Sequence, residues 1–200
     1  MLEPSDIKSL KRAMRHEYMQ IVSRFNGKSE ASSALVSNLL DSNLYSSASI
    51  LIGFMPMECE PNILPLLTHW IESGRTLLLP SFVQSTGNYG LAEVRGFGEQ
   101  YLIKGKYGIL EPCEKIPRQL PPYTFPKPAI WLVPGIAFAR NGLRLGRGGG
   151  YYDRLLAAST GVKIGVCFSC QLAESIPSTR QDVVMDYTLT ESCITKCTSN

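Results

Sequence analysis

An apolar run that leads directly into a glycine-rich segment is the strongest constraint on this chain. Residues 129–133 (AIWLV) predict a buried strand, and five glycines fall within nine positions of the segment 133–156 that follows. Glycine adopts backbone angles closed to other residues and lets the main chain approach a ligand closely. Residues 151–158 predict a helix, whose N-terminus carries a partial positive charge. The sequence therefore predicts a strand, loop and helix that together bind an anion.

Two arginines, Arg144 and Arg147, are interleaved with these glycines. Their donor forks suit phosphate oxygens, so we expect the anion to be a nucleotide polyphosphate. The Walker pattern Gly-x-x-x-x-Gly-Lys-Ser/Thr is absent, and the Tyr151-Tyr152-Asp153 sequence is foreign to the dinucleotide-binding fingerprint. A flexible surface loop with scattered charges is the alternative. We favour the anion site because a solvated linker has no need for two tyrosines and an aspartate directly behind its glycines.

Length and composition indicate one globular domain, residues 1–200, with 44% hydrophobic and 18% charged residues. A net charge of +3 permits anionic small molecules but does not indicate a dedicated nucleic-acid binder. The N-terminus lacks a secretory pattern, and no apolar run approaches the roughly 20 residues needed to span a bilayer. We expect a cytoplasmic monomer with no membrane or nucleic-acid partner.

The six cysteines are expected to be reduced structural thiols, because the chain has no secretory signal. Cys167 and Cys170 have the spacing of a redox or metal pair. They close a strand-like run, however, and no second ligand pair follows at zinc spacing.

A basic helix is predicted at the N-terminus, with Ser5 as its cap and its end near Phe25. Lys11 and Arg15 are four residues apart and project from the same side. Like charges at that spacing cost about 0.2–0.5 kcal/mol, and a bound anion would reverse the sign of this cost. On spacing alone, a solvated basic face is the favoured interpretation.

Strands and helices alternate along the chain, which predicts a parallel-rich α/β sheet with helices on both faces. The expected strands are 49–54, 76–79, 129–133, 162–168 and 183–190, and the further helices are 31–40 and 63–74, the latter stopped by Gly74. Pro80 is expected to close its strand, and residues 81–128 to make excursions from the sheet. Ligands gather beyond the carboxyl ends of such strands, so Glu60 and the glycine segment are expected at one rim.

Several blocks together resemble a known family. Residues 134–156, PGIAFARNGLRLGRGGGYYDRLL, resemble the signature of 5-formyltetrahydrofolate cyclo-ligases, also called 5,10-methenyltetrahydrofolate synthetases. Residues 11–15, 54–62, 107–112 and 186–190 resemble four other blocks of that family, so the resemblance spans nearly the whole chain.

The resemblance implies a single-domain, three-layer α/β/α sandwich with a mostly parallel, Rossmann-like sheet. It also implies an ATP- and Mg²⁺-dependent reaction. ATP phosphorylates the formyl oxygen of 5-formyltetrahydrofolate, nitrogen 10 closes onto the activated carbon, and phosphate leaves to give 5,10-methenyltetrahydrofolate and ADP. The alternatives are a non-catalytic nucleotide- or RNA-binding relative and an ATP-dependent enzyme acting on a different small amide.

By the same resemblance, Arg144, Arg147 and Tyr152 are the expected catalytic residues, since phosphoryl transfer needs charge stabilisation and alignment. The expected ATP contacts are Lys11, Arg12, Arg15, Arg144, Leu145, Gly146, Arg147, Gly148, Gly149, Gly150, Tyr151 and Tyr152. The expected folate contacts are Met55, Glu60, Tyr107, Arg147, Gly148, Gly149, Gly150 and Tyr151, with Glu60 bonded to the N–H edge of the pterin. Asp153 and Asp186 are expected to hold Mg²⁺, which prefers carboxylate and water oxygens.

Structural interpretations stand beside these roles. Asp153 also suits a helix N-terminus, Glu60 beside Pro61 suits a turn, and the two tyrosines suit helix-to-sheet packing. Asp186 within an apolar strand is harder to explain in this way, because a buried carboxylate needs a partner. The chain departs from common family forms at Ala139, Gly149, Ser81 and Ile63.

Overall fold

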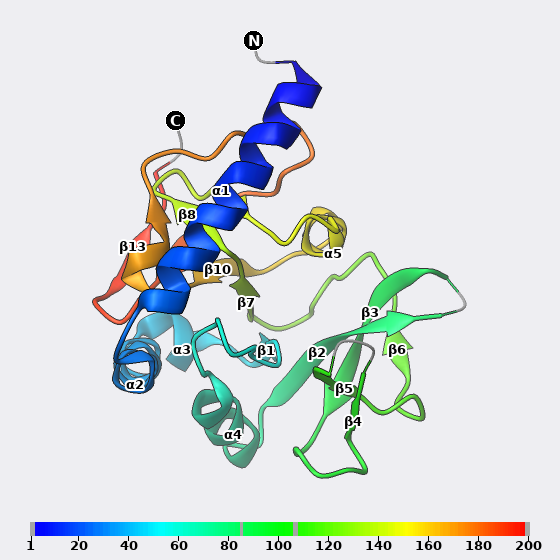
Figure 1. Cartoon of the computed structure of the whole chain (residues 1–200). Helices are drawn as coiled ribbons and strands as arrows, with labels where there is room; N and C mark the ends of the chain where they lie inside the picture. Colours follow the sequence, from blue (N-terminus) through cyan, green and yellow to red (C-terminus); the bar gives the residue numbers. More distant parts are fainter. Residues whose placement is uncertain (1–2, 85, 106–107, 199–200) are drawn as a thin grey trace.

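The computed structural model describes residues 3–84, 86–105 and 108–198. An eight-stranded sheet forms its centre; five adjacent strands are parallel, and antiparallel pairings extend it at both edges. In sheet order the strands are β13 (Ile194–Lys196), β12 (Tyr187–Leu189), β10 (Val162–Val166), β7 (Ala129–Pro134), β1 (Ile50–Ile52), β2 (Thr76–Val83), β3 (Asn88–Val94) and β6 (Arg118–Gln119), as Figure 1 shows. The predicted α/β fold with a mostly parallel sheet is confirmed.

Helices cover both faces of the sheet. Successive strand residues point to opposite faces, so a strand that is apolar throughout needs packing partners on both sides. The helices are α1 (Pro4–Arg24), α2 (Lys28–Leu40), α3 (Asn43–Ser47), α4 (Leu64–Glu72), α5 (Tyr151–Ala157) and the short 3₁₀ turn η1 (Ser169–Gln171). In β7, Ile130 and Leu132 pack into one core with α2 and α4, whereas Trp131 and Val133 pack into a second core with Leu155 of α5. The three layers are therefore helix, sheet and helix.

Two small sheets accompany the central one. A three-stranded sheet joins β11 (Leu172–Ala173), β8 (Ala137–Ala139) and β9 (Arg144–Leu145), and a separate hairpin joins β4 (Leu102–Lys104) and β5 (Leu110–Pro112). Helix α1 crosses in front of β8 and β10 in Figure 1, and its Met14 and Tyr18 pack against the core of the three-stranded sheet. This places the basic face of α1 beside the glycine segment.

Several predicted boundaries are wrong. Helix α1 begins at Pro4 with Glu3 as N-cap, because proline suits the first turn, so Ser5 is not the cap. Strand β2 continues past Pro80. Proline has no backbone N–H to donate, but β1 pairs with β2 only as far as Leu78, so no ladder bond to β1 is lost at this position. Strands β3 and β6 join the central sheet, so within residues 81–128 the hairpin β4–β5 is the strand pair outside it.

The six cysteines, all of them described, form no disulfide. Cys167 is fully buried, and burial raises the pKa of its thiol, as expected for a structural residue. No helix in the described ranges combines the length and apolarity needed to cross a membrane.

Candidate active site

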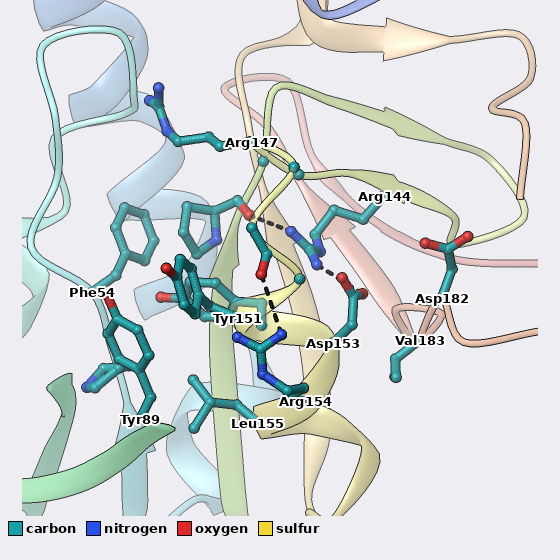
Figure 2. A pocket seen from close by; sticks show the side chains of 18 of the residues that line it. Phe54, Tyr89, Arg144, Arg147, Tyr151, Asp153, Arg154, Leu155, Asp182 and Val183 are labelled. Atoms are coloured by element: carbon teal, nitrogen blue, oxygen red, sulfur yellow. Dashed lines mark hydrogen bonds and ion pairs between the residues drawn. The ribbon is translucent and has the colours of Figure 1, made fainter. Parts of the chain in front are cut away.

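A cleft of about 1190 Å³ opens at the carboxyl edge of the parallel strands. Phe54 and Met55, which follow β1, line it together with Pro134 at the end of β7. The glycine segment and Glu60 line the same cleft, so the predicted meeting at one rim is confirmed. Figure 2 shows part of the lining, with Arg144 of β9 and Tyr151 at the start of α5.

The glycine segment needs its glycines for conformational reasons. Gly148 and Gly150 have φ angles of +100° and +63°, which L side chains rarely adopt. Gly146 also lines the cleft. Leu145, predicted to contact ATP, is instead fully buried in the core of the three-stranded sheet and does not line the cleft. The alternation of a strand explains this, because Arg144 and Leu145 point to opposite sides of β9.

Arg144 is a buried ion-pair partner, contrary to the expectation that both arginines present free donors. Its Nη2 lies 2.9 Å from Oδ1 of Asp153, and its side chain is only 4% exposed. Its Nη1 lies 3.5 Å from the carbonyl oxygen of Pro134, and its Nε has no hydrogen-bond partner among the described residues. The pair ties the start of α5 to β9 at the floor of the cleft (Figure 2).

Arg147 points in a different direction from Arg144 in Figure 2 and is 42% exposed. Its Nη2 donates to Oε1 of Glu60 at 3.2 Å and to Sγ of Cys59 at 2.9 Å. Burial lowers the pKa of Arg147, but its bonds and attractions to Cys59 and Glu60 outweigh this and raise it. The second oxygen of Glu60 accepts the N–H of Met57 at 3.0 Å, so both carboxylate oxygens already have partners.

Helix α1 contributes two cations to the cleft, Lys11 and Arg15. Nζ of Lys11 donates to both carboxylate oxygens of Asp182, at 2.7 and 2.8 Å, and Nε of Arg15 donates to the carbonyl of Gly146 at 2.8 Å. The interpretation of this helix as a solvated basic face is therefore wrong for Lys11 and Arg15. It holds for Arg12, predicted to contact ATP, which is exposed and does not line the cleft. One residue after Lys11, Arg12 lies about 100° further round the helix.

Aromatic rings form another part of the lining. Tyr151 is 41% exposed, and its ring lies 4.8 Å from that of Tyr89, centroid to centroid. The guanidinium of Arg154 lies 5.0 Å from the centroid of Tyr151, while its Nη1 donates to the carbonyl of Gly149. Tyr152 packs against the core beneath, and burial, aided by the charge of Glu60, raises the pKa of its phenol. Tyr107, another predicted contact, lies outside the described residues.

The structure does not bring Asp153 and Asp186 together, so the predicted metal pair is wrong in its second member. Asp186 is exposed and accepts the N–H of Lys163, which lies near the amino end of β10, whereas the cleft opens at the carboxyl ends. Asp182, four residues earlier, lines the cleft instead. The Met185 N–H donates to the carbonyl oxygen of Gly142 at 2.8 Å. This bond holds the segment that contains Asp182 and Asp186 against the turn between β8 and β9.

Sequence reasoning missed seven polar residues that line the cleft: Tyr89, Glu111, Arg154, Thr179, Arg180, Gln181 and Asp182. Arg154 lies near the end of the glycine-rich segment 133–156, and Glu111 lies in a block that carries the family resemblance, so both had a local signal. Tyr89 and Asp182 had none, because strands and loops far away in sequence deliver them.

The ion pair between Lys11 and Asp182 predicts a pH-dependent contribution to stability. Burial of Asp182 opposes its ionisation, but hydrogen bonds from Lys11 and Thr179 outweigh this and lower its pKa. Because folding lowers this pKa, ionised Asp182 contributes its full stabilisation above the pKa of the unfolded state, about 3.9. The stabilisation is lost as pH falls through the pKa of the folded state. Asp182→Asn should therefore lower Tm at pH 7 by about 2–4 °C, as expected for a loss of about 1 kcal/mol.

Thermal melts of wild type and Asp182→Asn between pH 7 and 2 check this. The difference in Tm should shrink as pH falls below about 4. Glu93→Gln is the matched control, because the Glu93–Arg95 pair is exposed, with side chains 42% and 75% accessible, and should change Tm little. A difference in Tm that persists unchanged at pH 2 would contradict the assignment.

The fold and the cleft define the class of protein: a three-layer α/β sandwich with a ligand-sized cleft, cationic and aromatic in its lining, at the carboxyl edge of its parallel strands. The chain belongs to the 5-formyltetrahydrofolate cyclo-ligase family of enzymes, whose model matches residues 5–191. The predicted family and enzyme class are confirmed.

Individual relatives agree with this membership. The chain is similar to the 5-formyltetrahydrofolate cyclo-ligase of Mycolicibacterium smegmatis, with 34% identity over 152 residues, 74% of this chain and 77% of the relative. The cyclo-ligase of Haemophilus influenzae is 30% identical over 117 residues, 57% of this chain and 60% of the relative. The solved 5,10-methenyltetrahydrofolate synthetase of Aquifex aeolicus superimposes with a TM-score of 0.79 at 28% identity and covers 94% of this chain and 93% of its own.

Proposed function

We propose that this protein uses ATP to convert 5-formyltetrahydrofolate into 5,10-methenyltetrahydrofolate, with release of ADP and phosphate. The observation that carries the proposal is that one cleft joins a cationic, glycine-rich part to an aromatic and apolar part. Single ligand pockets commonly measure about 300–1,000 Å³, so a volume of about 1190 Å³ leaves space for parts of two ligands. Family membership supplies the substrate class.

The cationic part suits a triphosphate. Lys11, Arg15 and Arg147 reach it from α1 and from the glycine segment, and Gly148 and Gly150 keep side chains out of the way. Donors placed before the reaction stabilise the charge that develops as the γ-phosphoryl group moves to the formyl oxygen. Nitrogen 10 then bonds to the formyl carbon and releases its proton to solvent, and the carbon–oxygen bond breaks as phosphate leaves.

We assign Arg147 to the phosphoryl group in transfer, because its guanidinium is half exposed and held by Glu60. Arg144, buried against Asp153, is better suited to holding the start of α5 in place. Burial raises the pKa of Tyr152, so its phenol ionises even less readily than an ordinary tyrosine and is a hydrogen-bond donor rather than a base. Contacts of Met55, Tyr151 and Glu60 with the folate stay predictions.

The residues present fit a nucleotide-bound Mg²⁺. The described residues contain no group of three or more histidine, cysteine, aspartate or glutamate side chains suited to a metal. Mg²⁺ in phosphate sites needs only one or two carboxylates, with water and phosphate oxygens as the other ligands. Asp153 lines the cleft and would hold it through its second carboxylate oxygen, since Arg144 engages only Oδ1, whereas both oxygens of Asp182 already accept from Lys11. The bound ion would neutralise phosphate charge during transfer.

One assay tests the proposal. Purified protein with ATP, Mg²⁺ and 5-formyltetrahydrofolate should produce the absorbance of the methenyl product together with equal amounts of ADP and phosphate. Nucleotide binding without product at saturating substrates would reject the proposal and favour a non-catalytic relative. ADP formation with a different small amide, but not with the folate, would favour the other enzymatic alternative. The monomeric state, the cytoplasmic location and the lack of a nucleic-acid partner stay predictions.

A further inference from the structure

Arg147, the arginine assigned to the phosphoryl group, is held by two neighbouring side chains. Its Nη2 donates to Sγ of Cys59 at 2.9 Å and to Oε1 of Glu60 at 3.2 Å. Figure 2 shows its side chain directed away from Arg144 and Asp153. Nε and Nη1 of Arg147 have no hydrogen-bond partner among the described residues, so the contacts through Nη2 are what fix the guanidinium in this direction.

Cys59 contacts Arg147 from outside the cleft. It does not line the cleft, but together with Glu60, Arg147 and Tyr18 it lines a separate cavity of about 10 Å³. A cavity of this size holds at most about one water molecule, so it has no room for a substrate group. Arg147 and Glu60 line both spaces, which places their ion pair in the wall between them. Cys59 therefore acts on a ligand in the cleft only through its neighbours.

Glu60 is the fixed member of this group, and Arg147 is the movable one. Oε2 of Glu60 accepts the N–H of Met57 at 3.0 Å, and the Glu60 N–H donates to the Met57 carbonyl at 2.8 Å, so a tight turn fixes the carboxylate. The side chain of Glu60 is 7% exposed, whereas that of Arg147 is 42% exposed. A ligand donor that pairs with Glu60 has to uncover Oε1, and the long, exposed arginine is the group that gives way.

Once displaced from Glu60, Arg147 has lost its anionic partner. A bound triphosphate then replaces that partner, because Arg147 and Gly148 line the same cationic part of the cleft. We propose that Cys59 and Glu60 are positioning residues, which hold Arg147 off the phosphates in the free protein and release it when the folate binds at Glu60. This rests on the proposed function and on the predicted contact between Glu60 and the folate. Transfer is then favoured only when the formyl acceptor is in place, which limits the loss of the phosphoryl group to water.

Release of Arg147 by the folate means that the two ligands strengthen each other's binding. Calorimetric titration of a non-hydrolysable ATP analogue with Mg²⁺ into the full-length protein, with and without saturating 5-formyltetrahydrofolate, measures this coupling. In wild type, the folate should lower Kd of the analogue about 5-fold or more. Arg147→Ala should abolish the coupling, because no arginine remains to be released. An analogue affinity that the folate leaves unchanged in wild type would overturn the inference.

Cys59→Ala weakens the hold on Arg147 without touching either ligand. Loss of one hydrogen bond should lower Kd of the analogue in the absence of folate by about 2–10-fold, because Arg147 is free in more of the molecules. The coupling should shrink by the same factor. Cys59→Ser should behave like wild type, since its hydroxyl can accept the same bond. Cys170→Ala is the matched control, because Cys170 packs against the same small core as Cys59 but does not line the cleft, and both values should stay unchanged.

Weaker or unchanged binding of the analogue to Cys59→Ala, in a sample that circular dichroism shows to be folded, would overturn the inference. A cysteine with a merely structural role does not tighten nucleotide binding when it is removed. The titrations involve no turnover and so separate this inference from the proposed function. Methenyl product without coupling would reject the inference alone, whereas coupling without product would reject the proposed function alone.

Discussion

Arg147→Ala is expected to lower the rate of methenyl formation by about 10²–10³-fold, the effect of removing one well-placed donor to a developing charge. Its guanidinium lies in the cleft, 42% exposed, with 3.2 Å between its Nη2 and Oε1 of Glu60. Stability should fall by about 1–3 kcal/mol, because Glu60 is only 7% exposed and loses one partner, although it keeps the N–H of Met57. Steady-state kinetics at saturating ATP and folate, with urea denaturation of the same samples, measure both quantities.

Arg95→Ala is the matched control for this variant. Arg95 also pairs with a glutamate, Glu93, but is 75% exposed and does not line the cleft, so activity and stability should both be close to wild type. Arg147→Lys should recover only part of the rate, because an ammonium lacks the planar donor fork. Loss of stability in Arg147→Ala equal to its loss of activity would instead make this arginine structural.

Asp153→Ala is expected to destabilise the protein by about 3–5 kcal/mol, the usual cost of leaving a buried charge without its partner. The side chain of Arg144 is 4% exposed, and its Nε already lacks a partner among the described residues. Without Asp153, its hydrogen bonds within the described residues reduce to the long contact with the Pro134 carbonyl. Urea denaturation at pH 7 gives the change in the free energy of unfolding.

A double variant separates structure from function at this pair. Arg144→Met with Asp153→Leu removes both charges and should recover most of the lost stability, because an apolar pair of similar volume avoids the desolvation cost. It should stay inactive if Asp153 also holds Mg²⁺, and its Mg²⁺-dependent nucleotide affinity should fall. A loss below about 1 kcal/mol in Asp153→Ala would show that Arg144 reaches solvent when released.

Much of the site follows from local sequence. Gly148 and Gly150 have positive φ and lie where the loop turns between a strand and a helix. The close spacing of glycines in the sequence indicates this turn. Reasoning from local sequence failed at the acidic residue, because it placed Asp186 in the cleft where the structure has Asp182. The apolar pattern of 183–190 suggested a longer strand, whereas β12 begins only at Tyr187, so Asp186 lies outside it.

By itself, the sequence determined the alternation of strands and helices, the rim at which ligands gather, and the family. These depend on periodicity and on local backbone preference, which neighbouring residues carry. Only the tertiary structure decided how the charges pair: Lys11 with Asp182, 171 positions away, and Arg147 with Glu60, 87 positions away. An ion pair depends on distance in space and on burial, and packing sets both.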